Sequence, residues 1–135
     1  MPLTLHYLSG SPYAWRVHLA LDHKGIPHTL RPMSYDAGDF RSPGFAALNP
    51  RRRVPVIEHD GFVLYESAAI LEYLEDIAPG APRLFSPDPR RRAIERRMVR
   101  EADEYFATKL EAWRTRMQAL PIIHETWPPH WGKPD

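Results

Sequence analysis

Apolar residues in the first part of the chain follow two different spacings. Short apolar runs bounded by turn residues are typical of β-strands. Four such runs predict strands at residues 3–8, 28–33, 54–59 and 62–65. Between the first two runs, apolar residues recur at intervals of three and four, which predicts a helix over residues 12–24. A second helix with this spacing is predicted to begin at Glu66–Ser67 and to stop before Pro79.

Cap and turn residues mark the ends of these segments. Ser11 is a favourable N-cap, Pro12 a favourable first helical residue, and Gly25 suits the end of the same helix. Asp60–Gly61 joins the last two strands as a tight hairpin turn. A short helix is expected around residues 45–48, within an otherwise irregular stretch.

The order of these elements predicts an α/β fold. A strand–helix–strand unit comes first, and it implies two parallel strands joined by a right-handed crossover. A strand–strand–helix unit follows and adds an antiparallel pair. We therefore expect a βαβ-ββα domain over residues 1–80, with a mixed four-stranded sheet and helices on its faces.

A different pattern begins after residue 80. Residues 81–89 contain three prolines and are predicted to form a linker. Residues 90–120 carry a helical apolar stripe, made of Ile94, Met98, Ala102, Tyr105, Phe106, Leu110, Trp113, Met117 and Leu120. A helix of that length would span roughly 45 Å and cannot bury its stripe alone, so we expect another surface to cover it. The tail, residues 121–135, is proline-rich and is predicted to be non-helical.

Composition narrows the class of protein. The 135 residues are 43% hydrophobic and 26% charged, as in an ordinary globular protein, and the net charge of +1 gives no reason to expect a nucleic-acid partner. No run of about 18 apolar residues occurs, and no secretory signal is visible, so we expect no membrane partner. The absence of cysteine fits a cytoplasmic protein and excludes disulfide exchange by this chain. The seven histidines show no metal-binding spacing, so no metal ligand is predicted.

Residues 54–74 carry the strongest chemical signal. Pro55 removes a backbone donor, which a sheet tolerates at an edge or a strand start. The helix at Glu66–Ser67 begins directly after a strand and directs free N–H groups and a positive dipole end at its surroundings. This combination suggests a surface that holds the backbone and a carboxylate of a small peptide-like ligand.

Three segments in this order resemble a known family. They are residues 11–17 (SPYAWRV), 49–56 (NPRRRVPV) and 66–74 (ESAAILEYL). In order and spacing they resemble the thioredoxin-like N-terminal domain of cytosolic glutathione transferases, with serine-type, zeta- and theta-like bacterial members the most similar. The resemblance is strong over residues 1–80 and weak over residues 88–118. It implies a C-terminal all-helical domain, of which this chain would hold only the first helix.

The resemblance implies a catalytic role for Ser11. In serine-type members the hydroxyl at the start of the first helix donates a hydrogen bond to the glutathione sulfur. A donor and a helix N-terminus both stabilise a thiolate, whose free thiol has a pKa of about 8.5. The alternative is that Ser11 is only an N-cap. Tyr7 ends the first strand, where other branches place their thiol donor, and is interpreted as a packing residue.

Glutathione contacts are implied for five residues. Val54 would offer its backbone N–H and C=O to the cysteinyl part, beside Pro55 as the cis-proline of the fold. Ser67 would hold the γ-glutamyl carboxylate and Glu66 the ammonium, while Arg53 would reach the glycyl carboxylate. The alternative for Pro55 is an ordinary edge-strand proline. For Glu66 and Ser67 it is a plain helix cap, and for Arg53 it is a solvated basic turn.

One neighbouring position departs from the family pattern. Arg52 stands where family members commonly carry glycine, which leaves the geometry of this loop open.

Two functions follow from the resemblance. The first is a glutathione transferase that activates the thiol of glutathione, its co-substrate, for attack on a small hydrophobic electrophile. One form of this chemistry is isomerisation of a cis-dienoic acid, as in zeta relatives. The second is a non-catalytic glutathione-binding or protein-interaction module. The shortened helical part favours the second, and the intact site residues favour the first. Neither requires another cofactor, and the family norm predicts a homodimer. A glutaredoxin-like oxidoreductase is excluded because the chain has no cysteine.

Overall fold

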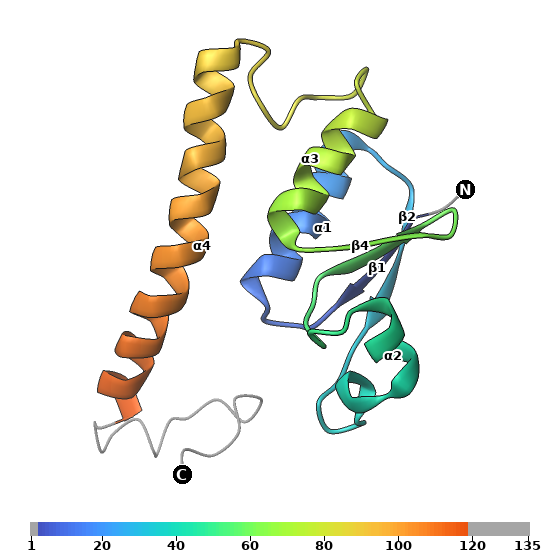
Figure 1. The fold of residues 1–135 in the computed structure, drawn as a ribbon, viewed down its shortest axis with the longest axis vertical. Coiled ribbons are helices and arrows are strands. Elements are labelled where there is room, and N and C mark those ends of the chain that lie inside the picture. The colour runs from blue at the N-terminus through green and yellow to red at the C-terminus, as the bar shows by residue number, and fades with distance from the viewer. Residues whose placement is uncertain (1–2, 119–135) are drawn as a thin grey trace. The chain divides into compact units, whose positions relative to one another are not determined.

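The computed structural model describes residues 3–118, with their side chains as far as residue 104. Two compact units divide the chain, residues 1–87 and 88–135. The elements are β1 (Leu3–Tyr7), α1 (Pro12–Lys24), β2 (His28–Pro32), a 3₁₀ turn η1 (Asp39–Arg41), α2 (Pro43–Leu48), β3 (Val56–His59), β4 (Phe62–Tyr65), α3 (Ser67–Ile77) and α4 (Pro89–Gln118) (Figure 1).

The first unit is built on one mixed sheet. Its strand order is β2-β1-β3-β4, with β1 parallel to β2 and antiparallel to β3, and β3 antiparallel to β4. The α/β class and the four-stranded mixed sheet are therefore confirmed. The hairpin turn is also confirmed, because Asp60 and Gly61 both take positive φ, at 51° and 80°.

Two separate cores cover the two faces of the sheet. Leu3 and Leu5 of β1 are fully buried in a cluster with residues of α1 and α3, which lie side by side (Figure 1). Val56 is buried in a second cluster with Phe40 and Phe45 of the η1–α2 segment. Since successive side chains of a strand point to opposite faces, these two clusters require the sheet to be covered on both sides.

Local chemistry explains where the elements begin and end. Ser11 caps α1 and Gly25 ends it in the left-handed conformation, with φ of 64°. Strand β3 begins at Val56, two residues later than the pattern predicts, because Pro55 has no N–H to contribute to the ladder.

Much of the segment expected to be a linker is packed into the first unit. The buried Lys24 ammonium donates to Glu75 Oε2 at 2.9 Å and to the Pro82 carbonyl at 3.2 Å. The Leu84 N–H donates to the same Glu75 oxygen at 2.9 Å. Leu84 also packs against the core cluster, and Phe85 is only 7% exposed. These contacts hold residues 82–85 on the ends of α1 and α3.

The described residues of the second unit form one long helix, α4. Helix α4 begins at Pro89, and the carboxylate of Asp88 accepts from the Arg91 N–H at 2.8 Å at its start. In the part with described side chains, Ile94 and Met98 are 51% and 58% exposed. None of the described helices is long and apolar enough to cross a membrane. The predicted tail and the side chains of Tyr105, Phe106 and Trp113 lie outside what the structure describes.

Candidate functional site

The strand register places three segments at one end of the sheet: the residues after β1, those before β3 and those after β4. His6 pairs with Val56, and Val56 pairs with Tyr65. Continuing both ladders beyond these pairs puts the residues after β1 beside Val54–Pro55, and Val54–Pro55 beside Glu66 and Ser67. The turn from β1 into α1, which contains Ser11, starts at this same end (Figure 1). The fold thus gathers the segments that carry every site residue expected from the sequence.

Ser11 is partly exposed at the N-terminus of α1. Its hydroxyl oxygen accepts from the Ala14 N–H at 3.2 Å, and its backbone N–H donates to the Leu8 carbonyl at 3.0 Å. Accepting through oxygen leaves the hydroxyl proton free to be donated to a ligand. Capping and thiol activation by Ser11 are therefore compatible functions. Tyr7, the rejected alternative, is half-buried and packs against the core of the α1–α3 face.

The Val54–Pro55 peptide bond is cis. Pro55 is buried and Val54 is half-buried. The backbone N–H and C=O of Val54 make no hydrogen bond within the described part of the chain. One peptide edge at this end of the sheet is therefore unpaired, and a peptide-like ligand can bond to it.

Asn49 holds the loop that leads to this peptide. It is 2% exposed, and its side chain donates to the Arg53 carbonyl at 2.8 Å and accepts from the Arg51 N–H at 2.9 Å. The Arg52 N–H donates to the backbone carbonyl of Asn49 at 2.9 Å. This positioning role was not predicted from the sequence. The signal that could have indicated it is a polar residue directly after a helix and before Pro50.

Arg52 keeps a glycine-like backbone, with φ of 53°. We expect Arg52→Gly to leave the free energy of unfolding within about 0.5 kcal/mol, because relief of left-handed strain offsets the greater freedom of unfolded glycine. Arg52→Val should cost about 1–2 kcal/mol, since a β-branched residue fits this region poorly. Urea unfolding measures both. Arg53→Val is the matched control, and equal stability of the two valine variants would contradict the assignment.

Glu66 and Ser67 form the start of α3. Glu66 takes φ of 72° and ψ of 108°, a backbone conformation that costs a non-glycine residue about 1–3 kcal/mol. Its carboxylate bonds the Arg51 guanidinium at 2.6 Å. Both side chains are more than half exposed, so this pair adds about 1 kcal/mol at most. The exposed Glu66 carboxylate can still accept from a ligand ammonium.

The N-terminus of α3 has no side-chain cap. Ser67 is 6% exposed, and its hydroxyl makes no hydrogen bond to the residues that the structure describes. By contrast, Ser11 caps α1 and Ser42 caps α2. The uncapped N–H groups and the free hydroxyl can receive a carboxylate. The side chain of Arg53, in the loop before Val54, is exposed.

Two further features lie away from this end of α3. A cavity of about 500 Å³ opens on the α2 side of the sheet, with His6 and Glu58 among its lining residues; none of the expected site residues lines it. On the other face, His18, Asp22 and His28 come together. The sequence did not predict this cluster of possible metal ligands, because the spacing of residues along the chain does not show which of them a turn brings together.

Comparisons with known proteins identify the family of this chain. Residues 10–77 match the family model "Glutathione S-transferase, N-terminal domain". A maleylacetoacetate isomerase of Pseudomonas aeruginosa is 46% identical over 99 residues, which cover 71% of this chain and 45% of that protein.

Solved structures share the fold. A diazinon-metabolizing glutathione S-transferase of the silkworm Bombyx mori superposes with a TM-score of 0.79 at 31% identity, covering 90% of this chain and 59% of that one. A glutathione transferase homologue from Burkholderia, with bound glutathione, gives a TM-score of 0.65 at 28% identity, covering 73% and 52%.

The chain spans about half the length of the curated relatives that it matches. The matched residues hold the whole sheet end described above apart from β1, together with α1 and α3. The chain belongs to the glutathione S-transferase family.

Proposed function

We propose that the chain binds glutathione at the sheet end formed by Ser11, Val54–Pro55 and Glu66–Ser67. The observation that carries this proposal is the uncapped N-terminus of α3 with its free Ser67 hydroxyl. A carboxylate suits this position, and the γ-glutamyl end of glutathione carries a carboxylate and an ammonium next to one another. Under this proposal residues 1–80 form the glutathione-binding domain, 81–89 connect it, and 90–120 belong to an all-helical domain.

Each part of the tripeptide has a matching group. Ser67 and the α3 N–H groups bind the γ-glutamyl carboxylate, and Glu66 accepts from the ammonium. The unpaired backbone edge of Val54 bonds the cysteinyl part. Arg53 binds the glycyl carboxylate. The strained backbone of Glu66 supports a functional role, because such conformations persist mainly where function requires them.

The reaction that we propose is thiol activation and attack on an electrophile. Ser11 donates its hydroxyl proton as a hydrogen bond to the cysteinyl sulfur, and the positive end of α1 adds to the stabilisation of the thiolate. The thiolate then attacks a small hydrophobic electrophile. Relatives named maleylacetoacetate isomerase support a second form of the reaction, in which reversible thiolate addition isomerises a cis-dienoic acid.

Two further proposals concern partners. We expect a homodimer, and the exposed Ile94 and Met98 of α4 support a covering surface for this helix.

The alternative to catalysis is a module that binds glutathione or a protein partner without turnover. The intact Ser11 geometry favours the enzyme.

Calorimetric titration of glutathione into the 135-residue chain tests the binding site. We expect Ser67→Ala to weaken binding by about 10- to 100-fold, since a hydrogen bond to a charged group contributes about 1.5–3 kcal/mol. Glu66→Gln should weaken it by a smaller factor, because the exposed carboxylate is screened by solvent.

Ser34→Ala is the control, because Ser34 caps a turn after β2 rather than α3. Its glutathione affinity should equal that of the unmodified chain. Absence of binding at millimolar glutathione, or equal affinity in Ser67→Ala, would overturn the proposed site.

A further inference from the structure

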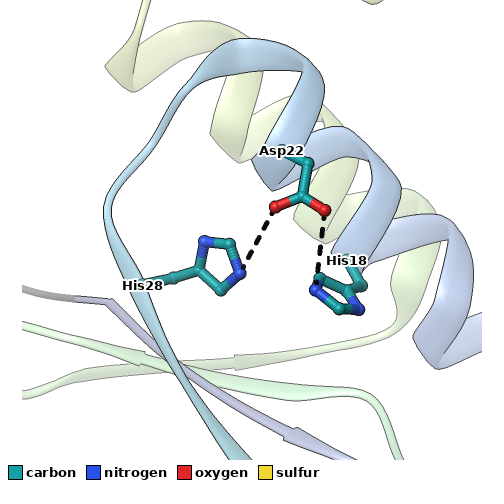
Figure 2. Close-up of side chains that lie close together, drawn as sticks. All are labelled: His18, Asp22 and His28. Carbon is teal, nitrogen blue, oxygen red and sulfur yellow. Dashed lines mark ion pairs between the residues drawn. The ribbon is translucent and has the colours of Figure 1, made fainter.

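Two histidines and an aspartate converge beside the turn between α1 and β2. His18 and Asp22 lie one turn apart on α1, and His28 is the first residue of β2 (Figure 2). Gly25 ends α1 in the left-handed conformation, and the chain then reverses direction. This reversal brings the ring of His28 to 5.4 Å from the ring of His18, at an edge-to-face angle of 79°.

The polar atoms of the three side chains point toward one another. Asp22 Oδ2 lies 3.6 Å from His18 Nε2, and Asp22 Oδ1 lies 3.7 Å from His28 Nε2 (Figure 2). One ligand atom from each residue falls within 4.8 Å of the other two. Tetrahedral ligands at about 2.1 Å from a metal are about 3.4 Å apart. Small side-chain rotations would therefore bring all three groups to coordination distance.

His28 is also held in the tautomer that a metal needs. Its Nδ1 lies 2.8 Å from the Ile26 carbonyl, which can only accept, so Nδ1 carries the hydrogen. In the neutral ring, Nε2 then has a free lone pair directed at the cluster. Metal-binding histidines characteristically make such a bond from the other ring nitrogen to a carbonyl or carboxylate.

We propose that His18, Asp22 and His28 form a site for a divalent first-row transition ion of the zinc type. Two imidazoles and a carboxylate are a ligand set that Zn²⁺ accepts, with a fourth position left for water. The Asp22 side chain is 61% exposed, which gives the ion a path in, while the His28 side chain is 12% exposed. The bound ion would tie the end of α1 to the start of β2.

This site is separate from the proposed glutathione site. Asp22 lies eleven residues beyond Ser11 on α1, a distance of roughly 16 Å along the helix axis. Zinc binding and glutathione binding can therefore be tested independently.

Titration of the full chain with Zn²⁺ alone, followed by calorimetry and thermal unfolding, tests the proposal. We expect saturable binding and a rise in melting temperature on the order of 10–20 °C at a hundredfold excess over the dissociation constant. Asp22→Asn should lower the affinity at least about tenfold, as should His28→Gln. Co²⁺, whose visible absorption reports a nitrogen–oxygen ligand set, should compete with Zn²⁺ at the same site.

His59→Gln is the matched control. His59 also lies near a carboxylate, Asp60, at 3.8 Å, and its Nδ1 is bonded to the Tyr73 hydroxyl, but no described second imidazole joins this pair. Zinc affinity should be unchanged in this variant. Undetectable zinc binding, or equal affinity in Asp22→Asn and the unmodified chain, would overturn the proposal. Because Asp22 is exposed, Asn at this position should fold normally.

Discussion

Replacing Glu75 by glutamine is expected to lower the free energy of unfolding by about 3–5 kcal/mol. The reason lies in Lys24, whose side chain is fully buried and whose ammonium is bonded to Glu75 at 2.9 Å. Glutamine offers only a neutral oxygen, and the Pro82 carbonyl, the other acceptor described for this ammonium, is neutral as well, so the buried charge is no longer compensated. A typical domain has about 5–15 kcal/mol of stability, so this loss is a large fraction. Urea unfolding at pH 7 measures it.

The double variant separates charge pairing from packing. Lys24→Met with Glu75→Gln removes both charges, and we expect it to be more stable than Glu75→Gln alone, because no buried ammonium is left unpaired. Glu72→Gln, a change on the same helix outside this ion pair, should alter stability much less. A double variant no more stable than Glu75→Gln would contradict this account of the pair.

The contribution of Glu75 should also depend on pH. Burial by itself raises the pKa of Glu75, but the Leu84 N–H, the Lys24 ammonium and the Arg83 guanidinium together hold it below its ordinary value. A carboxyl with a lowered folded-state pKa adds stability above its unfolded-state pKa and loses that stability as pH falls through the lower value. The difference between the unmodified chain and Glu75→Gln should therefore shrink in acid, below about pH 4. A difference that stays constant down to pH 2 would contradict this cause.

Ser11→Ala is expected to lower the rate of glutathione conjugation at pH 7 by about 25-fold. A two-unit fall in thiol pKa, worth about 2.7 kcal/mol, raises the thiolate fraction at pH 7 from about 3% to about 75%. Removing the donor should reverse that change and move the pH–rate profile upward by about two units. Glutathione affinity should change little, because the other anchors of the ligand remain. Conjugation of a generic aryl halide, measured from pH 6 to pH 9, gives the profile.

Ser42→Ala provides a close control for this variant. Ser42 caps α2 as Ser11 caps α1, each accepting from a backbone N–H at 3.2 Å and each followed by proline. Both alanine variants should lose about 1 kcal/mol of stability from the cap, and only Ser11→Ala should shift the pH profile. Ser11→Thr should retain most of the rate. Glutathione binding without turnover, identical in Ser11→Ala, would favour the non-catalytic module.

Local sequence signals predicted most of the fold. Apolar spacing located the strands and helices, and Asp60–Gly61 and Gly25 marked turns that need positive φ. The resemblance added the cis bond before Pro55, which spacing alone does not reveal. It also favoured Ser11 over Tyr7 as the thiol donor; Tyr7 is half-buried and packs against the core cluster.

Contacts between distant residues could not be predicted in the same way. Lys24 and Glu75 lie 51 positions apart, and nothing in the pattern of either helix indicates that their charged ends meet. Arg51 bonds Glu66, 15 residues away, and no local signal in the sequence indicates this pair. The cluster of His18, Asp22 and His28 depends on the chain reversal after Gly25, which ends α1 in the left-handed conformation. In each case the tertiary fold, rather than local propensity, brings the groups together.

The packing of residues 82–85 bears on how this domain can be exchanged with others. A fusion or chimera that cuts the chain at residue 80 would discard the carbonyl of Pro82 and the N–H of Leu84, both bonded within the Lys24–Glu75 network. It would also uncover core surface beneath Leu84 and Phe85. A portable version of the first unit should therefore retain the chain through Pro87, where this compact unit ends.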